Sequence, residues 1–135
     1  MLRRVGRTIM RTRQRTDEDI NHIDKKYDWV EWRPFPNPER NDFIYAPFGF
    51  GVYQLRNKVT GEYIRFGGGK NEAYRMSSFL PSPYGQGTRE NKQKRGYVWK
   101  NITEIEYRTV VCGGKNEAQR IQEELKRMKI HRFNT

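Results

Sequence analysis

Two strand-forming segments joined by a short turn place the strongest constraint on how this chain folds. Residues 51–56 and 62–66 are short runs that contain valine, leucine, isoleucine, tyrosine and phenylalanine, as β-strands do. The turn between them, residues 57–61, ends in a glycine, where a hairpin can require a positive φ. The sequence therefore predicts an antiparallel β-hairpin. Three consecutive glycines at 67–69 follow it, and we expect them to break the sheet.

Downstream of the hairpin, the sequence predicts two helices and one more strand. A helix is expected over residues 71–80, and a basic loop rich in proline and glycine over residues 81–96. Residues 104–111 alternate like a half-buried strand, and residues 115–129 carry apolar residues at helical spacing. The apolar stripe of this last helix consists of Ala118, Ile121, Leu125 and Met128. The order β-β-α-β-α predicts a small α+β sandwich.

The net charge of +11 is distributed unevenly and divides the chain into three parts. Residues 1–16 contain six arginines and no acid, whereas residues 17–47 carry four basic and eight acidic residues. Residues 48–135 carry seventeen basic and eight acidic residues. We therefore predict a basic arm, an extended connector and one folded domain. The simplest partner of such a chain is a polyanion, so we expect nucleic acid, with RNA somewhat preferred over DNA.

The arginine-rich arm has three interpretations. Its apolar residues can form one side of an amphipathic helix, as in a mitochondrial import segment, which would place the protein in the mitochondrial matrix. An arm that binds nucleic acid or other proteins of an assembly is an equal alternative, in a bacterial or phage-infected cytoplasm if no import occurs. A solvated tail is the third. The basic side chains that such an arm would present include Arg3, Arg4, Arg7 and Arg11.

The connector combines aromatic residues with closely spaced prolines. Residues 34–38 contain three prolines, so this part can form neither a regular helix nor a central strand. Trp29, Trp32 and Phe35 still require burial. We expect an extended segment that presses these rings onto the domain or onto a partner, or alternatively a small cluster beneath a long loop.

Composition excludes several classes of site and protein. The single cysteine, Cys112, leaves no internal disulfide framework and no cysteine-based zinc cluster. His22 and His131 are too few for a histidine-rich metal site. No run of about 18 apolar residues is present, so no membrane span is expected.

A cluster of basic residues with interleaved aromatics predicts contacts with phosphates and unpaired bases. The basic residues are Arg89, Lys92, Lys94, Arg95 and Lys100. Tyr97 and Trp99 lie among them and could stack on bases. Alternatively, both belong to the core beside Val98, and for Trp99 burial is the preferred interpretation.

The hairpin and the segments after it resemble the GIY-YIG nuclease superfamily. Residues 51–53 read Gly-Val-Tyr, and residues 63–65 read Tyr-Ile-Arg, like the two tyrosine-containing strands of that family. The other matches are Arg75 in the next helix, Glu117 and Ala118 at the start of the last helix, and Phe133 and Asn134 near the end. The resemblance covers about residues 48–135 and implies a GIY-YIG-like sandwich.

The resemblance implies catalytic roles for four residues. Tyr53 would activate a water, while Tyr63 and Arg75 would handle the scissile phosphate. Lys70 lies where the family often has a basic residue. Asn134 matches the asparagine that closes the family's pattern, and we group it with the residues expected to bind nucleic acid.

Three positions depart from the family's pattern. The family's last helix carries a glutamate that holds one divalent metal, and counting along the helix places Gln122 there. A neutral carboxamide should hold Mg²⁺ poorly, unless Glu123 substitutes for it. Arg65 stands where the motif has glycine and adds a cation that could bind nucleic acid. Phe79 stands where some members have histidine.

Two functions are compatible with these residues. The first is a protein that binds nucleic acid without cutting it, needs no cofactor, and belongs to a ribonucleoprotein or another large assembly, such as the mitochondrial ribosome. The second is a Mg²⁺-dependent endonuclease that cleaves phosphodiester bonds of DNA or RNA, with a rearranged carboxylate. We favour the first, because the expected metal carboxylate is replaced.

Overall fold

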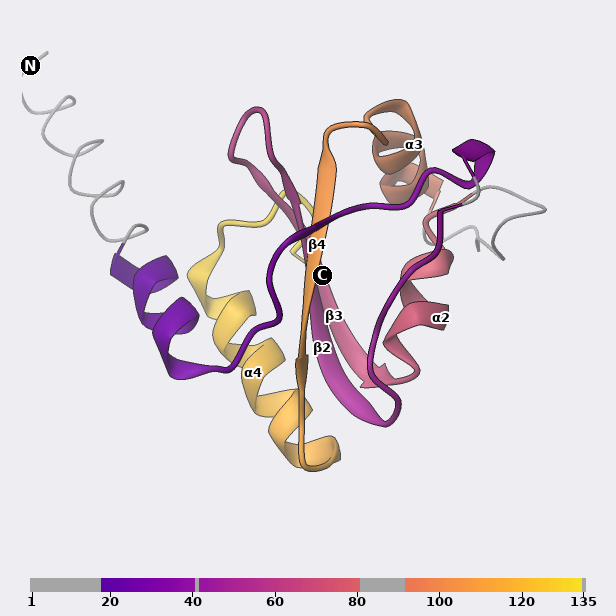
Figure 1. Ribbon diagram of the computed structural model, residues 1–135. Coiled ribbons are helices and arrows are strands. Elements are labelled where there is room, and N and C mark those ends of the chain that lie inside the picture. Colours follow the sequence, from indigo (N-terminus) through magenta and orange to yellow (C-terminus); the bar gives the residue numbers. More distant parts are fainter. Residues whose placement is uncertain (1–17, 41, 81–91, 135) are drawn as a thin grey trace, which may run out of the picture.

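The computed structural model describes residues 18–40, 42–80 and 92–134 and consists of one antiparallel sheet with helices on both faces (Figure 1). The sheet has four strands in the order β1-β4-β2-β3. The strands are β1 (Arg33–Pro34), β2 (Phe50–Asn57), β3 (Tyr63–Lys70) and β4 (Ile105–Val111). The predicted α+β class is therefore confirmed.

Helices cover the two faces of the sheet as separate groups. Helix α4 (Lys115–Met128) and the helical segment 18–26 lie on one side, while α2 (Glu72–Ser77) and α3 (Lys92–Lys100) lie on the other (Figure 1). A 3-10 turn, η1 (Pro38–Arg40), lies in the connector. Within the described ranges, no helix has the length and apolar character needed to cross a membrane.

The predicted hairpin is present as β2 and β3. Asn57 organises the turn, because its side-chain oxygen accepts hydrogen bonds from the backbone N–H groups of Val59 and Thr60, at 2.9 and 3.1 Å. Gly61 has φ of +76°, as expected from its place at the end of the turn. The pairing is irregular between Leu55 and Arg56, where a bulge shifts the register.

The expectation that residues 67–69 break the sheet is wrong. Strand β3 continues to Lys70, with Gly67 paired to Tyr53 and Gly69 paired to Gly51. Side chains from other elements occupy the space that Cβ atoms at these glycines would need; a Cβ on Gly68, for example, would lie 2.6 Å from Nε2 of Gln122. The glycines therefore permit close approach of side chains to the strand, rather than ending it.

The helix predictions are partly confirmed. The last helix has its predicted bounds to within a residue, and Ala118, Ile121 and Leu125 are buried. The helix predicted over residues 71–80 ends at Ser77 and continues only as turns. Residues 92–96 were expected in a loop but begin α3, because lysine, glutamine and arginine favour helices and Val98 anchors the helix to the core. The remainder of that predicted loop, residues 81–91, lies outside the described residues.

Each face of the sheet has its own hydrophobic core. Tyr53, Leu55 and Tyr107 are buried beneath α2 and α3, together with Met76 and Phe79. The face beneath α4 buries a second group, made of Ile23, Val52, Phe66, Val110, Cys112, Ala118, Ile121 and Leu125. The sheet therefore separates two hydrophobic cores, one under each group of helices.

The connector lies against the sheet through a buried arginine. Arg108 of β4 is 5% exposed, and its guanidinium lies between the rings of Trp29 and Trp32, at 4.2 and 4.6 Å from their centroids. It donates hydrogen bonds to Gln54 at 2.8 Å and to Asp24 at 2.6 Å. The connector's tryptophans thus pack on the domain, while Phe35 enters the core beside Tyr107.

We predict that Arg108→Ala lowers the free energy of unfolding by about 2–4 kcal/mol, because it removes two cation–π contacts and leaves the buried Gln54 oxygen without a donor. Urea denaturation followed by tryptophan fluorescence measures the change. Arg132→Ala is the control, because this side chain is exposed. Its ion pair with Glu62 and its contact with the Tyr97 ring, at 4.4 Å, should each contribute about 1 kcal/mol or less. Equal losses in both variants would contradict a special role for Arg108.

Candidate functional site

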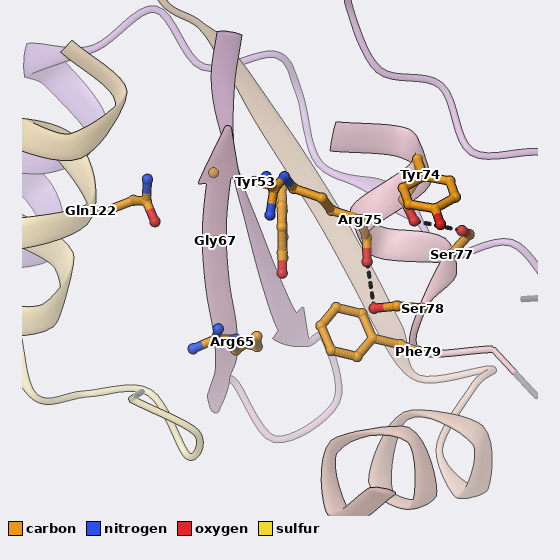
Figure 2. A pocket seen from close by; sticks show the side chains of 10 residues that line it. Tyr53, Arg65, Gly67, Tyr74, Arg75, Ser77, Ser78, Phe79 and Gln122 are labelled. Carbon is orange, nitrogen blue, oxygen red and sulfur yellow. Dashed lines mark hydrogen bonds between the residues drawn. The ribbon is translucent and has the colours of Figure 1, made fainter. Parts of the chain in front are cut away.

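A cleft of about 370 Å³ opens between strand β3 and helix α2. Four residues of interest from the sequence line it: Tyr53, Arg65, Arg75 and Gln122. Figure 2 shows these side chains around β3, with Arg75 on one side of the strand and Gln122 on the other. The remaining lining residues are Gly67, Gly68, Tyr74, Ser77, Ser78 and Phe79. The cleft thus presents mainly cationic and hydrogen-bonding groups.

Tyr53 lies over the glycine-rich strand. Its ring occupies the space that a side chain at Gly67 would take, and it meets Phe79 edge-on with ring centroids 6.1 Å apart. Burial raises the pKa of the Tyr53 phenol, and the neighbouring Arg65 and Arg75 oppose that rise. At neutral pH the phenol therefore keeps its proton and can donate a hydrogen bond into the cleft.

Arg75 reaches back from α2 to the end of β3. Its Nε donates a hydrogen bond to the backbone oxygen of Lys70 at 3.2 Å. A Cβ at Gly69 would lie 2.7 Å from Nη2 of Arg75, and Gly69 itself has φ of +135°. The glycine therefore provides both the backbone conformation and the space that position this guanidinium.

Arg65 connects the cleft to the end of the chain. It pairs with Leu55 in the hairpin and forms a parallel bridge with Phe133, whose backbone oxygen accepts a hydrogen bond from Nη1 at 3.4 Å. Asn134 follows directly and donates a hydrogen bond to the Lys126 backbone oxygen at 3.0 Å. The C-terminal segment thus places a second guanidinium in the cleft.

Gln122 approaches β3 from α4. Its Nε2 donates a hydrogen bond to the Ala118 backbone oxygen at 3.3 Å. The neighbouring Glu123 does not line the cleft; it lines an adjacent hollow of about 200 Å³ together with Asn134 and Lys126. The structure therefore brings the carboxamide of Gln122, and not the carboxylate of Glu123, into the cleft with Tyr53.

Tyr63 does not line the cleft, although the resemblance groups it with Tyr53 and Arg75. Its ring contacts Trp32 and His131, at centroid distances of 6.1 and 5.6 Å. His131 in turn contacts Gln54 and also Phe66, which belongs to the core beneath α4. The bulge in the hairpin explains the difference, because it shifts the register between Tyr63 and Arg65.

The other predicted binding residues lie apart from the cleft or outside the described ranges. Lys70 is exposed at the end of β3, with Nζ 5.6 Å from the Phe50 ring. Lys92, Lys94 and Arg95 lie on α3, where Lys92 is exposed and the other two are half-buried. The predicted contacts at Arg3, Arg4, Arg7, Arg11 and Arg89 fall on residues that the structure does not describe.

Sequence reasoning missed a buried acid beside the cleft, Glu72. This side chain is 0% exposed, and neither carboxyl oxygen has a hydrogen-bond partner in the described part of the chain. The carboxyl group of Glu72 lies in the space that a Cβ at Gly51 of strand β2 would need. Burial raises the pKa of Glu72 to about 8. An acidic residue in the first turn of a helix is ordinarily explained by its favourable interaction with the helix dipole. The sequence therefore contained no sign that Glu72 would be buried.

Comparison with protein-family models, with curated proteins and with solved structures returns no match for this chain. The interpretation of the cleft therefore depends on its geometry and its chemistry.

We predict that Glu72 makes the protein less stable as pH rises. The folded-state pKa of about 8 exceeds the ordinary value of 4.5, so the contribution of Glu72 to stability is greatest below pH 4.5 and falls until pH passes 8. Glu72→Gln should therefore stabilise the protein at pH 9, by on the order of 5 kcal/mol, and the gain should vanish near pH 4.5. Urea denaturation at several pH values measures this, with Glu123→Gln as an exposed control. Parallel pH profiles for Glu72→Gln and the wild type would contradict it.

Proposed function

We propose that this protein binds nucleic acid without cutting it, through a GIY-YIG-like domain whose cleft holds a backbone phosphate. The observation that carries the proposal is that Arg65, Arg75 and Gln122 all line one cleft. Guanidiniums match the geometry of phosphate oxygens and stay charged at any physiological pH. Ser77 and Ser78 line the same cleft with hydroxyls that can hydrogen-bond to phosphate.

The arrangement of elements supports the GIY-YIG-like part of the proposal. A hairpin, a helix, a strand and a final helix follow one another in the order that the resemblance implies, with α3 added before β4. Tyr53, Arg75 and Gln122 are far apart in sequence, yet all three line the cleft. These are three of the positions that the family's motifs occupy.

The second motif of the family fits this chain better when it is moved by two residues. Its glycine would then be Gly67, the residue that makes room for Tyr53 on the opposite strand. Its tyrosine position would then be Arg65, which lines the cleft, whereas Tyr63 does not. In this alignment a guanidinium replaces a phenol at the phosphate, and the change adds a full positive charge.

Magnesium, which the endonuclease alternative would require, does not suit this cleft. Mg²⁺ prefers carboxylate, phosphate and water oxygens, and the family-matched position offers the neutral amide of Gln122. The two arginines at the cleft would repel a divalent cation. The residues present suit an anion better than a metal ion.

The assembly and the choice of RNA are further parts of this proposal. Single-stranded RNA loops can place a phosphate in a narrow cleft more readily than a stiff duplex can. Membership in a ribonucleoprotein, including a mitochondrial ribosome, depends on the arm of residues 1–16. Identification of the RNA and proteins that co-purify with the tagged full chain tests it.

We predict that Arg65→Ala and Arg75→Ala each weaken binding to a single-stranded RNA about tenfold at low salt. Each variant should also reduce the slope of log affinity against log salt by about 0.7, because one phosphate contact is lost. Fluorescence anisotropy at several salt concentrations measures both quantities. Lys58→Ala is the matched control, because it removes the same charge from the exposed hairpin turn.

Two outcomes would contradict the proposal. Equal slopes for the cleft variants and for Lys58→Ala would show that the cleft does not hold the phosphate. Cleavage of the RNA or of plasmid DNA with Mg²⁺ or Mn²⁺, abolished by Tyr53→Phe, would instead establish the endonuclease alternative.

We also predict that Gln122→Glu increases the affinity of the cleft for Mg²⁺, because it restores the carboxylate that the family uses. Isothermal titration calorimetry should detect a heat of binding in this variant that the wild type does not give. Glu123→Gln should leave the wild-type titration unchanged, since Glu123 lies outside the cleft. If Gln122→Glu and the wild type titrate alike, position 122 is not the metal position of the family.

A further inference from the structure

A second hollow borders helix α2, between that helix and the connector. It measures about 360 Å³, and we call it the connector groove. The cleft that Arg65 and Arg75 line, which we call the cationic cleft, has a similar volume of about 370 Å³. Its walls are mostly apolar and include Pro36, Ile44 and Leu80. Ser77 lines both the connector groove and the cationic cleft, so one residue of α2 separates the two.

The connector groove has an exposed aromatic ring at its edge. Phe43 lines it and is 70% exposed, although a phenylalanine ring gains free energy from burial. Tyr74, on the cleft side of α2, is 64% exposed. Two accessible rings therefore accompany the cationic cleft, one on each side of the short helix.

We propose that the connector groove binds an unpaired base of the same nucleic acid whose phosphate lies in the cationic cleft. This inference rests on the proposed function. A single strand alternates an anionic phosphate with a flat, largely apolar base, and the surface alternates a cationic cleft with an apolar groove. A base that enters the groove gains a stacking surface on Phe43, and such stacking tolerates any base.

Asp42 supports this assignment of phosphate and base to separate hollows. Its carboxylate lines the connector groove, and Oδ2 accepts a hydrogen bond from the Asn37 backbone N–H at 3.3 Å. A negative charge there repels phosphate, but it can accept a hydrogen bond from the amino group of a base. Phosphate therefore belongs with Arg65 and Arg75, and the base belongs beside Phe43.

This arrangement selects unpaired strands over duplexes. In a duplex each base is paired and stacked between its neighbours, and removing one from the stack costs free energy. The cationic cleft alone would bind both kinds of nucleic acid, because phosphates are common to them. Preference for the single strand should therefore depend on the connector groove and not on the arginines.

The test compares variants of the full chain on a single-stranded RNA of mixed sequence and on the matching duplex. Phe43→Ala should lower affinity for the single strand about tenfold, equivalent to about 1.4 kcal/mol, and leave duplex affinity and the salt slope unchanged. Phe48→Ala is the control, because this ring is 96% exposed and does not line the groove. A 2-aminopurine base in the single strand should lose fluorescence on binding to the wild type and regain it with Phe43→Ala.

The outcomes separate this inference from the proposed function. If Phe43→Ala binds like the wild type, or if it loses single-strand and duplex affinity equally, the base site is refuted. The phosphate site still stands in that case, provided that Arg75→Ala weakens binding to both ligands. If neither arginine variant changes binding, the proposed function itself is wrong, whatever Phe43→Ala does.

Discussion

The candidate site depends on the absence of side chains along one strand. Gly67, Gly68 and Gly69 remain paired in β3, and three side chains from three other elements lie against them. Tyr53 comes from the neighbouring strand, Arg75 from α2 and Gln122 from α4. Any larger residue at these positions would displace the side chain that lies against it. The bare backbone of β3 therefore lets Tyr53, Arg75 and Gln122 approach the strand and line the cleft. The cost in strand propensity is offset by the pairing of β3 with β2 along its whole length.

The buried guanidinium of Arg108 holds the connector on the sheet. Arg108 fills the space between two tryptophans, and its hydrogen bonds to Gln54 and Asp24 satisfy the charge. Gln54 in turn meets His131, whose pKa burial lowers to about 3, so this ring stays neutral. The connector is thereby held on the sheet, and the same segment continues to the groove beside α2.

The sequence predicted the periodic elements well and the contacts between them poorly. The hairpin turn and the last helix follow from Asn57, Gly61 and the apolar stripe of α4, which are local signals. The cleft depends on register, and a bulge that no local pattern marks moves Tyr63 away and brings Arg65 in. Burial of Glu72 depends on a glycine twenty-one residues earlier in the chain, so only the folded sheet reveals it.

Arg65 and Gln122 together set the electrostatic character of the cleft. Under the proposed alignment with the nuclease pattern, Arg65 would take the place of a phenol and Gln122 the place of a carboxylate, so the cleft would gain one positive charge and lose one negative charge. Each change strengthens attraction for a phosphate and weakens attraction for a divalent cation, which the chemistry of cleavage would need. The raised pKa of Tyr53 acts in the same direction, because a protonated phenol donates a hydrogen bond to an anion but is a poor base. Arg65, Gln122 and the protonated Tyr53 thus all favour a tightly held phosphate over an activated water.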